Sequence, residues 1–198
     1  MNPMNPNVSR IVYGLLGVLM LTACASPPSH FYALNSTQEA LAGLPYPVSI
    51  AVGPVTIPET VNRSEIVVQA GPNRIGLDEL NRWAAPLQSD IQRVIMEDLV
   101  QLLGTPRVSR YPQGPVTTPD FRVQIEVLRF ESMPGDAVLL DVIWTVRAKT
   151  EKDEKTGRTT LREPATGPGY DALVAAHSRA LGTLSRNLAE VILEGIGR

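Results

Sequence analysis

In two neighbouring stretches of the chain apolar residues recur at every second position, and a period of two predicts β-strands with one buried face. The first stretch has its apolar residues at Phe121, Val123, Ile125 and Val127. The second has them at Val138, Leu140, Val142, Trp144, Val146 and Ala148. The residues between them, Met133 to Asp136, include Pro and Gly, so the sequence predicts a turn and a long antiparallel hairpin.

Two other segments carry apolar residues at helical spacing, which predicts amphipathic helices. The first extends from Pro86 to Leu103, and Pro86 suits a first helical turn while Gly104 suits a helix end. Its apolar positions are Leu87, Ile91, Val94, Ile95, Leu99, Leu102 and Leu103. The second extends from Tyr170 to Ile196, with a stripe of Leu173, Ala176, His177, Ala180, Leu184, Leu188, Val191 and Ile192.

Shorter strands complete the predicted fold. They span His30 to Leu34, Val48 to Val55, a hairpin of Ser64 to Ala70 with Arg74 to Leu77, and Thr159 to Arg162 after a charged tip at Glu151 to Gly157. We therefore expect an α+β fold, a two-layer sandwich in which two long amphipathic helices cover a mostly antiparallel sheet. Residues 30–198 have the size of a single domain that buries its core without disulfides.

The N-terminus has the features of an export signal, which we assign to residues 1–23. Arg10 precedes an apolar run from Ile11 to Leu21, and these 11 residues would span only about half of a bilayer of roughly 30 Å. The next residues resemble a lipobox, Leu21-Thr22-Ala23-Cys24, and Cys24 is the single cysteine of the chain. We expect Cys24 to carry diacylglycerol and an N-acyl lipid such as palmitate; an ordinary cleavage site beside a chance cysteine is the alternative.

The segment that follows Cys24 predicts where the domain lies. Residues 24–29 form a lipidated tether with two prolines, whose reach is about 18 Å. The domain is therefore expected close to a membrane. Ala25 stands where many enterobacterial lipoproteins have an inner-membrane retention Asp, so by resemblance it favours the periplasmic face of the outer membrane.

Residue types argue against an enzyme and against nucleic-acid binding. The chain has two histidines, His30 and His177, and neither occurs in a metal-ligand spacing. His177 lies on the apolar stripe of the last helix, where a hydrogen-bonded core or interface histidine is expected rather than a catalytic one. The pairs Glu97-Asp98 and Asp153-Glu154 are interpreted as solvated faces, and a net charge of -2 gives no basic surface for nucleic acid. No cofactor or metal is predicted beyond the covalent lipid.

Three short motifs, following the lipobox in order, carry a resemblance to a known family. They are Phe31-Tyr32-Ala33-Leu34, Arg82-Trp83-Ala84-Ala85-Pro86-Leu87 at the start of a helix, and Gly169-Tyr170-Asp171-Ala172-Leu173-Val174 at the start of the last one. The ordered set resembles the ABC-type transport auxiliary lipoproteins, whose known member is paraquat-inducible protein C. The likeness extends over essentially the whole chain.

The resemblance implies a function and partners. It implies a non-catalytic subunit of a lipid transport system, anchored in the outer membrane, that supports membrane integrity. The partners would be a mammalian-cell-entry (MCE) domain tunnel protein and inner-membrane transport components, and the fold would be similar to the N-terminal domain of the Tol system's β-propeller protein. The alternative is an envelope assembly or stability lipoprotein that binds an outer-membrane protein or peptidoglycan.

Two aromatic residues in these motifs are candidates for partner binding. Trp83 qualifies because tryptophan is enriched at interface hot spots, although a core position at the helix entry is favoured. Tyr170 precedes Asp171, which suits a helix N-cap or first turn. A homo-oligomeric ring is a further expectation, since closed cyclic symmetry leaves no unsatisfied interface.

Overall fold

The computed structural model describes residues 27–39, 45–112, 114, 118–149 and 154–196, which form two sheets and two helices. The predicted export signal and Cys24 lie outside these residues. The elements, in chain order, are β1 (His30–Tyr32), β2 (Ile50–Thr56), β3 (Glu65–Gly71), β4 (Arg74–Trp83), α2 (Leu87–Leu103), β5 (Val108–Arg110), β6 (Phe121–Met133), β7 (Ala137–Ala148), β8 (Glu154–Pro164) and α3 (Gly169–Ile196). No helix within the described residues is long and apolar enough to cross a membrane.

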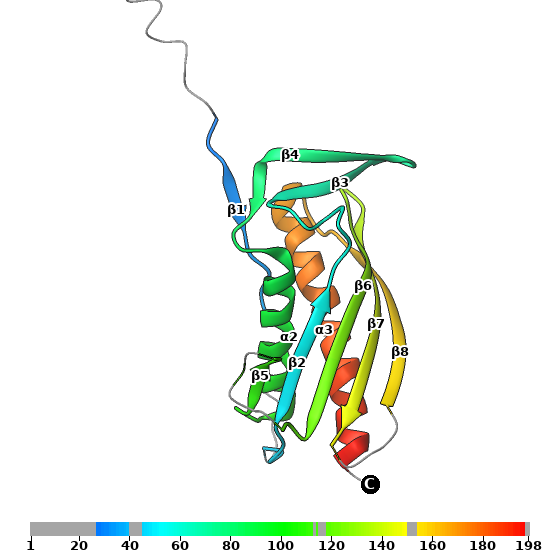
Figure 1. Ribbon diagram of the computed structural model, residues 1–198. Coiled ribbons are helices and arrows are strands. Elements are labelled where there is room, and N and C mark those ends of the chain that lie inside the picture. Colours follow the sequence, from blue (N-terminus) through cyan, green and yellow to red (C-terminus); the bar gives the residue numbers. More distant parts are fainter. Residues whose placement is uncertain (1–26, 40–44, 113, 115–117, 150–153, 197–198) are drawn as a thin grey trace, which may run out of the picture.

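The larger sheet has five strands in the order β5-β2-β6-β7-β8 (Figure 1). The predicted hairpin forms its centre: β6 and β7 pair antiparallel along their whole length, from Phe121 opposite Ala148 to Met133 opposite Ala137. β8 continues the antiparallel arrangement on one side. On the other side β2 pairs parallel with both β6 and β5.

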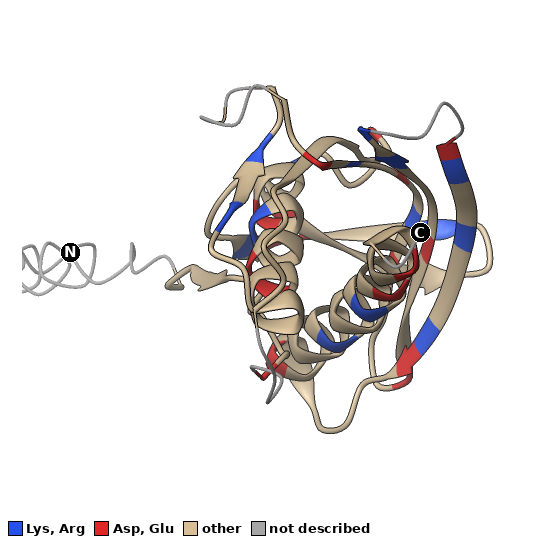
Figure 2. Cartoon of the chain, turned by 90° about the horizontal axis from the view of Figure 1, so that it is seen from below, with Lys and Arg blue, Asp and Glu red and all other residues tan. Residues whose placement is uncertain are grey.

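Both helices cover the same face of this sheet, as the view along them shows (Figure 2). α2 and α3 run side by side in the same direction, and α3 packs on β7 and β8 while α2 packs on β2. The fully buried side chains between the layers include Ile91 and Leu99 from α2, Leu184 from α3 and Leu140 from β7. A single core therefore joins both helices to the sheet.

A smaller sheet of order β1-β4-β3 crosses one end of the molecule (Figure 1). β1 pairs parallel with the end of β4, with His30 opposite Asn81, and β3 pairs antiparallel with β4. β4 carries a bulge at Asp78, whose carboxylate accepts hydrogen bonds from the backbone N–H groups of Leu80 and Asn81. Beyond the bulge, Arg82 of β4 lies opposite both Phe31 of β1 and Glu65 of β3.

The ends of α2 follow from its sequence. Pro86 is the N-cap, and the N–H groups of Ser89 and Asp90 donate to its carbonyl. Gly104 ends the helix in the left-handed conformation at φ 62°, and a Cβ there would lie 3.2 Å from the backbone of Pro45. Glycine is the residue that both the conformation and the close approach require. The predicted limits of this helix are confirmed to within one residue.

The predicted α+β class with two helices is confirmed, but the expectation of a mostly antiparallel sheet is wrong. Three of the six strand pairings among the described residues are parallel. α2 carries the chain back along the length of the sheet, so β5 re-enters beside β2 in the same direction. The proposed likeness to the Tol protein's N-terminal domain is not confirmed.

The prediction of a charged tip at Glu151 to Gly157 is also wrong in part. Residues 151–153 lie outside the described residues, whereas Glu154 to Gly157 belong to β8. Gly157 lies opposite Trp144 across the β7–β8 ladder, and the indole ring occupies the space above it. The Nε1–H of Trp144 donates to Thr159 Oγ1 at 3.0 Å, which holds the ring in this place.

We predict that Gly157→Ala destabilises the fold by about 1 to 3 kcal/mol, because a Cβ at this position would lie 2.2 Å from the Trp144 ring. The melting temperature should fall and the tryptophan emission should change. The matched control is Gly71→Ala in the other hairpin, where the nearest atom would be Arg74 Cβ at 3.8 Å. Equal melting temperatures for the two variants would contradict the assignment of Gly157 to the strand.

Candidate functional site

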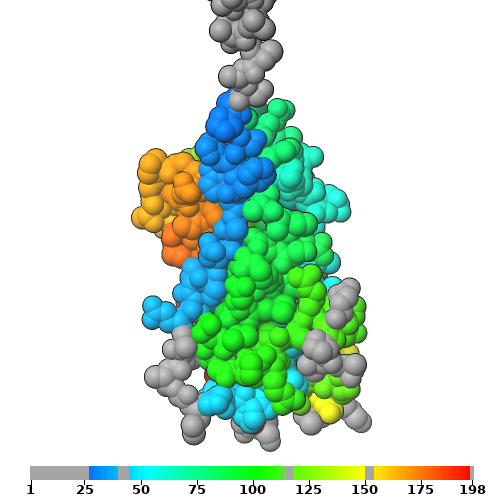
Figure 3. Space-filling model, turned by 90° about the vertical axis from the view of Figure 1, so that its left-hand side faces the viewer, coloured from blue at the N-terminus to red at the C-terminus, as the bar shows by residue number. Residues whose placement is uncertain are grey.

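The first described residues cross the helical layer as an extended segment. We call Ala33 to Gln38 the N-terminal strap; it follows β1 and lies along the junction of α2 and α3 (Figure 3). Its polar atoms bond to side chains of both helices. The strap is thus the connection between the predicted lipid tether and the body of the domain.

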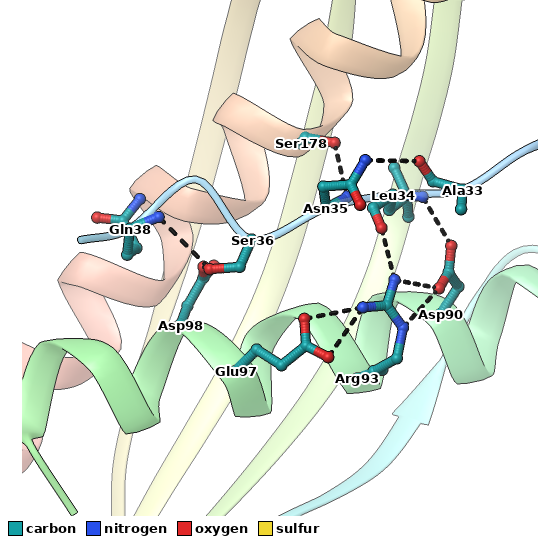
Figure 4. A network of polar contacts seen from close by, with 10 residues as sticks. All are labelled: Ala33, Leu34, Asn35, Ser36, Gln38, Asp90, Arg93, Glu97, Asp98 and Ser178. Atoms are coloured by element: carbon teal, nitrogen blue, oxygen red, sulfur yellow. Dashed lines mark hydrogen bonds and ion pairs between the residues drawn. The ribbon is translucent and has the colours of Figure 1, made fainter. Parts of the chain in front are cut away.

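The first half of the strap is held by charged groups of α2 (Figure 4). The Leu34 N–H donates to Asp90 Oδ2 at 2.8 Å, and Arg93 Nη2 donates to the Leu34 carbonyl at 2.5 Å. Arg93 also bonds Asp90 and Glu97, so its guanidinium is fixed in position. The Leu34 side chain is fully buried. Charge-assisted bonds of this kind are roughly twice as strong as neutral ones.

The second half of the strap is held at Asp98, which is fully buried between the helices. Its carboxylate accepts hydrogen bonds from Ser36 Oγ at 2.6 Å and from Ser185 Oγ of α3 at 2.8 Å. Backbone N–H groups of Thr37 and Gln38 also donate to it. Burial nevertheless raises the pKa of Asp98 above its usual value, because desolvation outweighs these bonds.

α3 leaves room for the strap by using small residues. Ser178 Oγ accepts the Asn35 N–H at 3.1 Å, and a Cβ at Gly182 would lie 2.2 Å from Thr37 Oγ1. The interpretation of Glu97-Asp98 as a solvated pair is therefore wrong for Asp98, whereas Glu97 is 46% exposed. The spacing of Ser178, Gly182 and Ser185 on one side of α3 is the signal that could have located this contact.

We predict that Asp98→Ala releases the strap, because it leaves the hydroxyls of Ser36 and Ser185 without their acceptor. Hydrogen exchange should become faster at the amides of residues 34–38, and the free energy of unfolding should fall by about 1 to 3 kcal/mol. Glu190→Ala, at an exposed acidic residue of α3, is the control. Unchanged exchange at these amides would show that Asp98 does not hold the strap.

Trp83 lies in an aromatic cluster under the small sheet. It is 6% exposed. Its ring lies edge-on to the rings of Phe130 and His177, with centroid distances of 6.2 and 6.4 Å. Phe130 and His177 stack at 3.8 Å. The structure places Trp83 at the end of β4, three residues before the N-cap Pro86 of α2. These contacts are those of a core residue, the alternative that the sequence favoured; a partner-binding role stays a prediction.

His177 is the hydrogen-bonded core histidine that the sequence predicted. It is 1% exposed, and its Nε2 lies 2.9 Å from Ser132 Oγ. Desolvation lowers its pKa to about 3, so the imidazole is neutral at physiological pH. A neutral ring stacked on Phe130 is suited to packing rather than to proton transfer with a substrate.

Tyr170, the other candidate for partner binding, is half-buried near the end of the molecule that carries the small sheet. Its ring centre lies 6.0 Å from that of Tyr32, and its hydroxyl bonds to Asp78. Burial and this carboxylate raise the pKa of Tyr170. Asp171 lies in the first turn of α3, as expected. Tyr170 thus joins α3 to the bulge of β4, and partner binding by it stays a prediction.

We predict that acid destabilises the protein through His177. The unfolded state takes up a proton near pH 6.5 but the folded state only near pH 3, so the free energy of unfolding should fall as the pH drops across this window, by up to about 1.4 kcal/mol per pH unit. In urea titrations between pH 4.5 and 7, His177→Gln should show a shallower dependence. His30→Gln, at an exposed position, should keep the wild-type slope; equal slopes for both variants would refute the assignment.

The described residues contain no group of three His, Cys, Asp or Glu side chains that could hold a metal ion. The polar clusters among them connect elements of the fold: Asp141, for example, is 3% exposed and bonds Arg158 and Thr160 across β7 and β8.

Comparison with known proteins identifies the class to which this α+β domain with its N-terminal strap belongs. The family model described as the ABC-type transport auxiliary lipoprotein component matches residues 32–189. The chain belongs to this family. The members of this family are auxiliary lipoprotein components of ABC-type transport systems, as the sequence motifs predicted.

Solved structures show the same fold. A crystal structure titled as an uncharacterized protein matches with a TM-score of 0.68 and 18% identity, covering 84% of this chain and 99% of the other. Protein XCC0632 from Xanthomonas campestris matches with a TM-score of 0.67 and 17% identity, covering 81% and 93%. At these identities the likeness concerns the fold alone. No match was found among curated proteins.

Proposed function

We propose that the protein is a non-catalytic, outer-membrane-anchored subunit of an MCE-type lipid transport system. It would act as a periplasmic adaptor that docks the distal end of an MCE tunnel protein and so supports membrane integrity. Energy would come from an ATPase elsewhere in the complex. The observation that carries the proposal is the match to the auxiliary lipoprotein family over residues 32–189.

The N-terminal strap supports an adaptor role. A lipid on Cys24 would hold the tether, and the tether leads within a few residues into β1 and the strap. Because the strap is bonded to both helices, a load on the anchor would pass to the core of the domain rather than to a loose terminus. An adaptor between a membrane and a long partner needs such a connection.

The alternative function is that of an envelope assembly or stability lipoprotein that binds an outer-membrane protein or peptidoglycan. The same anchor and strap would serve it equally. The two proposals differ in the partner, so partner identity separates them.

We predict that Cys24→Ala abolishes the anchor, because the cysteine sulfur is the atom that would form the bond to the lipid. Metabolic labelling with palmitate should mark the wild type and leave the variant unlabelled, as an unprocessed precursor or a protein that fractionates away from the outer membrane. Equal labelling of both proteins would refute the lipoprotein assignment at this cysteine.

The partner is tested by cross-linking in intact cells and affinity purification of the lipidated protein. The expected result is recovery of an MCE-domain protein together with a permease and an ATPase encoded near it, and the same set should be reduced for Cys24→Ala. Recovery of an outer-membrane protein or peptidoglycan instead would favour the alternative.

A ring of identical subunits is part of the proposal, because a tunnel-like partner is most simply met by closed cyclic symmetry. Light scattering on the lipidated protein in detergent should give a mass several times that of one chain. A monomer across micromolar concentrations would remove the ring and leave a one-to-one tether.

A further inference from the structure

Large apolar side chains gather on the small sheet at one end of the molecule. The described residues expose five large hydrophobic side chains, and four of them belong to β1 and β4. They are Phe31 (65% exposed), Ile75 (53%), Leu77 (49%) and Leu80 (37%). We call these four residues the apolar cap. Surface apolar residues scattered singly need no explanation, whereas a group of four on one small sheet does.

The chain path relates this cap to the predicted lipid. Residues 27–30 are exposed where the chain enters β1 (Figure 1). His30 is six peptide units from Cys24, so it lies within about 22 Å of the lipidated residue. His30 is opposite Asn81 in the β1–β4 pairing, so Leu80 lies one residue before the segment of β4 that pairs with β1. Leu77 lies three residues earlier in β4, so it is at most about 10 Å from Leu80 along the strand.

We propose that the apolar cap rests on the lipid surface, so that the protein lies with its small sheet against the membrane and with the β5 end of the large sheet away from it. The proposal rests on the lipid anchor at Cys24 that the proposed function includes. It adds the face that the anchored domain turns to the bilayer.

Two observations favour a lipid surface as the occupant. A short tether with two prolines keeps this end of the domain near the bilayer, so the cap meets lipid before it meets another surface. The charges of the small sheet and the turn before it also balance, with three arginines and three acidic residues between Arg63 and Trp83. Arg82 and Glu65 pair at 2.6 Å. An anionic leaflet therefore does not repel this end as a whole.

The remaining exposed hydrophobic residue supplies a matched control. Tyr46 is 39% exposed and lies at the opposite end, where its N–H donates to the carbonyl of Leu103 at the end of α2. A lipidated Cys24 leaves no free thiol in the chain, so one introduced cysteine can be labelled alone. Phe31 is too near Cys24 to discriminate between orientations, whereas Leu77 and Leu80 do discriminate.

The test uses the lipidated protein with Leu77→Cys, Leu80→Cys or Tyr46→Cys, each labelled with an environment-sensitive fluorophore and reconstituted into phosphatidylethanolamine–phosphatidylglycerol vesicles. A quencher attached to the lipid acyl chains should quench the labels at positions 77 and 80 roughly threefold or more above the label at 46, because interfacial side chains lie within about 5 to 10 Å of the acyl boundary. Circular dichroism checks the fold of each variant.

Three results would overturn the proposal. Equal, weak lipid quenching at all three positions in protein that floats with the vesicles would leave the anchor intact and reject the orientation. Labels at 77 and 80 shielded from both the lipid quencher and aqueous iodide would show that a second copy covers the cap. Failure of all three proteins to float with the vesicles would remove the anchor, and with it both this proposal and the anchored adaptor.

Discussion

The buried carboxylate of Asp98 and the pair of Asp90 and Arg93 join the two helices to the N-terminal strap, and the position of the strap depends on these bonds. Asp98 accepts bonds from Ser36 of the strap and Ser185 of α3 while belonging to α2. Such a carboxylate is costly to bury, and its raised pKa reflects that cost. By accepting bonds from both the strap and α3, the carboxylate fixes the strap between α2 and α3.

The two layers behind this junction give it a rigid base. α2 and α3 pack on a five-stranded sheet through one continuous core, and the aromatic cluster of Trp83, Phe130 and His177 extends the core under the small sheet. Tyr170 ties α3 to the bulge of β4. Strap, small sheet and helices therefore form one connected structure, which would suit the proposed adaptor.

The sequence predicted those elements in which the apolar residues repeat at a regular helical or strand spacing. The β6–β7 hairpin and both helices were found because their apolar residues repeat without interruption. The extent of β8 was missed because its helix-facing positions hold Lys155, Gly157 and Glu163: the lysine and the glutamate pair with Glu194 and Arg179 of α3, and Trp144 covers the glycine. β5 has three residues, too few to show a period. The role of Asp98 was hidden because its partner residues lie 62 and 87 positions away in sequence.

The central claim is that a short tether and a bonded strap fix the distance and orientation of the domain at the membrane. It is tested most directly by energy transfer from a donor at the far end, at Tyr46→Cys, to acceptor lipids in the same vesicle. The account predicts a narrow distribution of donor lifetimes for the native tether and a broad one after insertion of a Gly/Ser segment between Ser29 and His30. Distributions of equal width in the two proteins would contradict it.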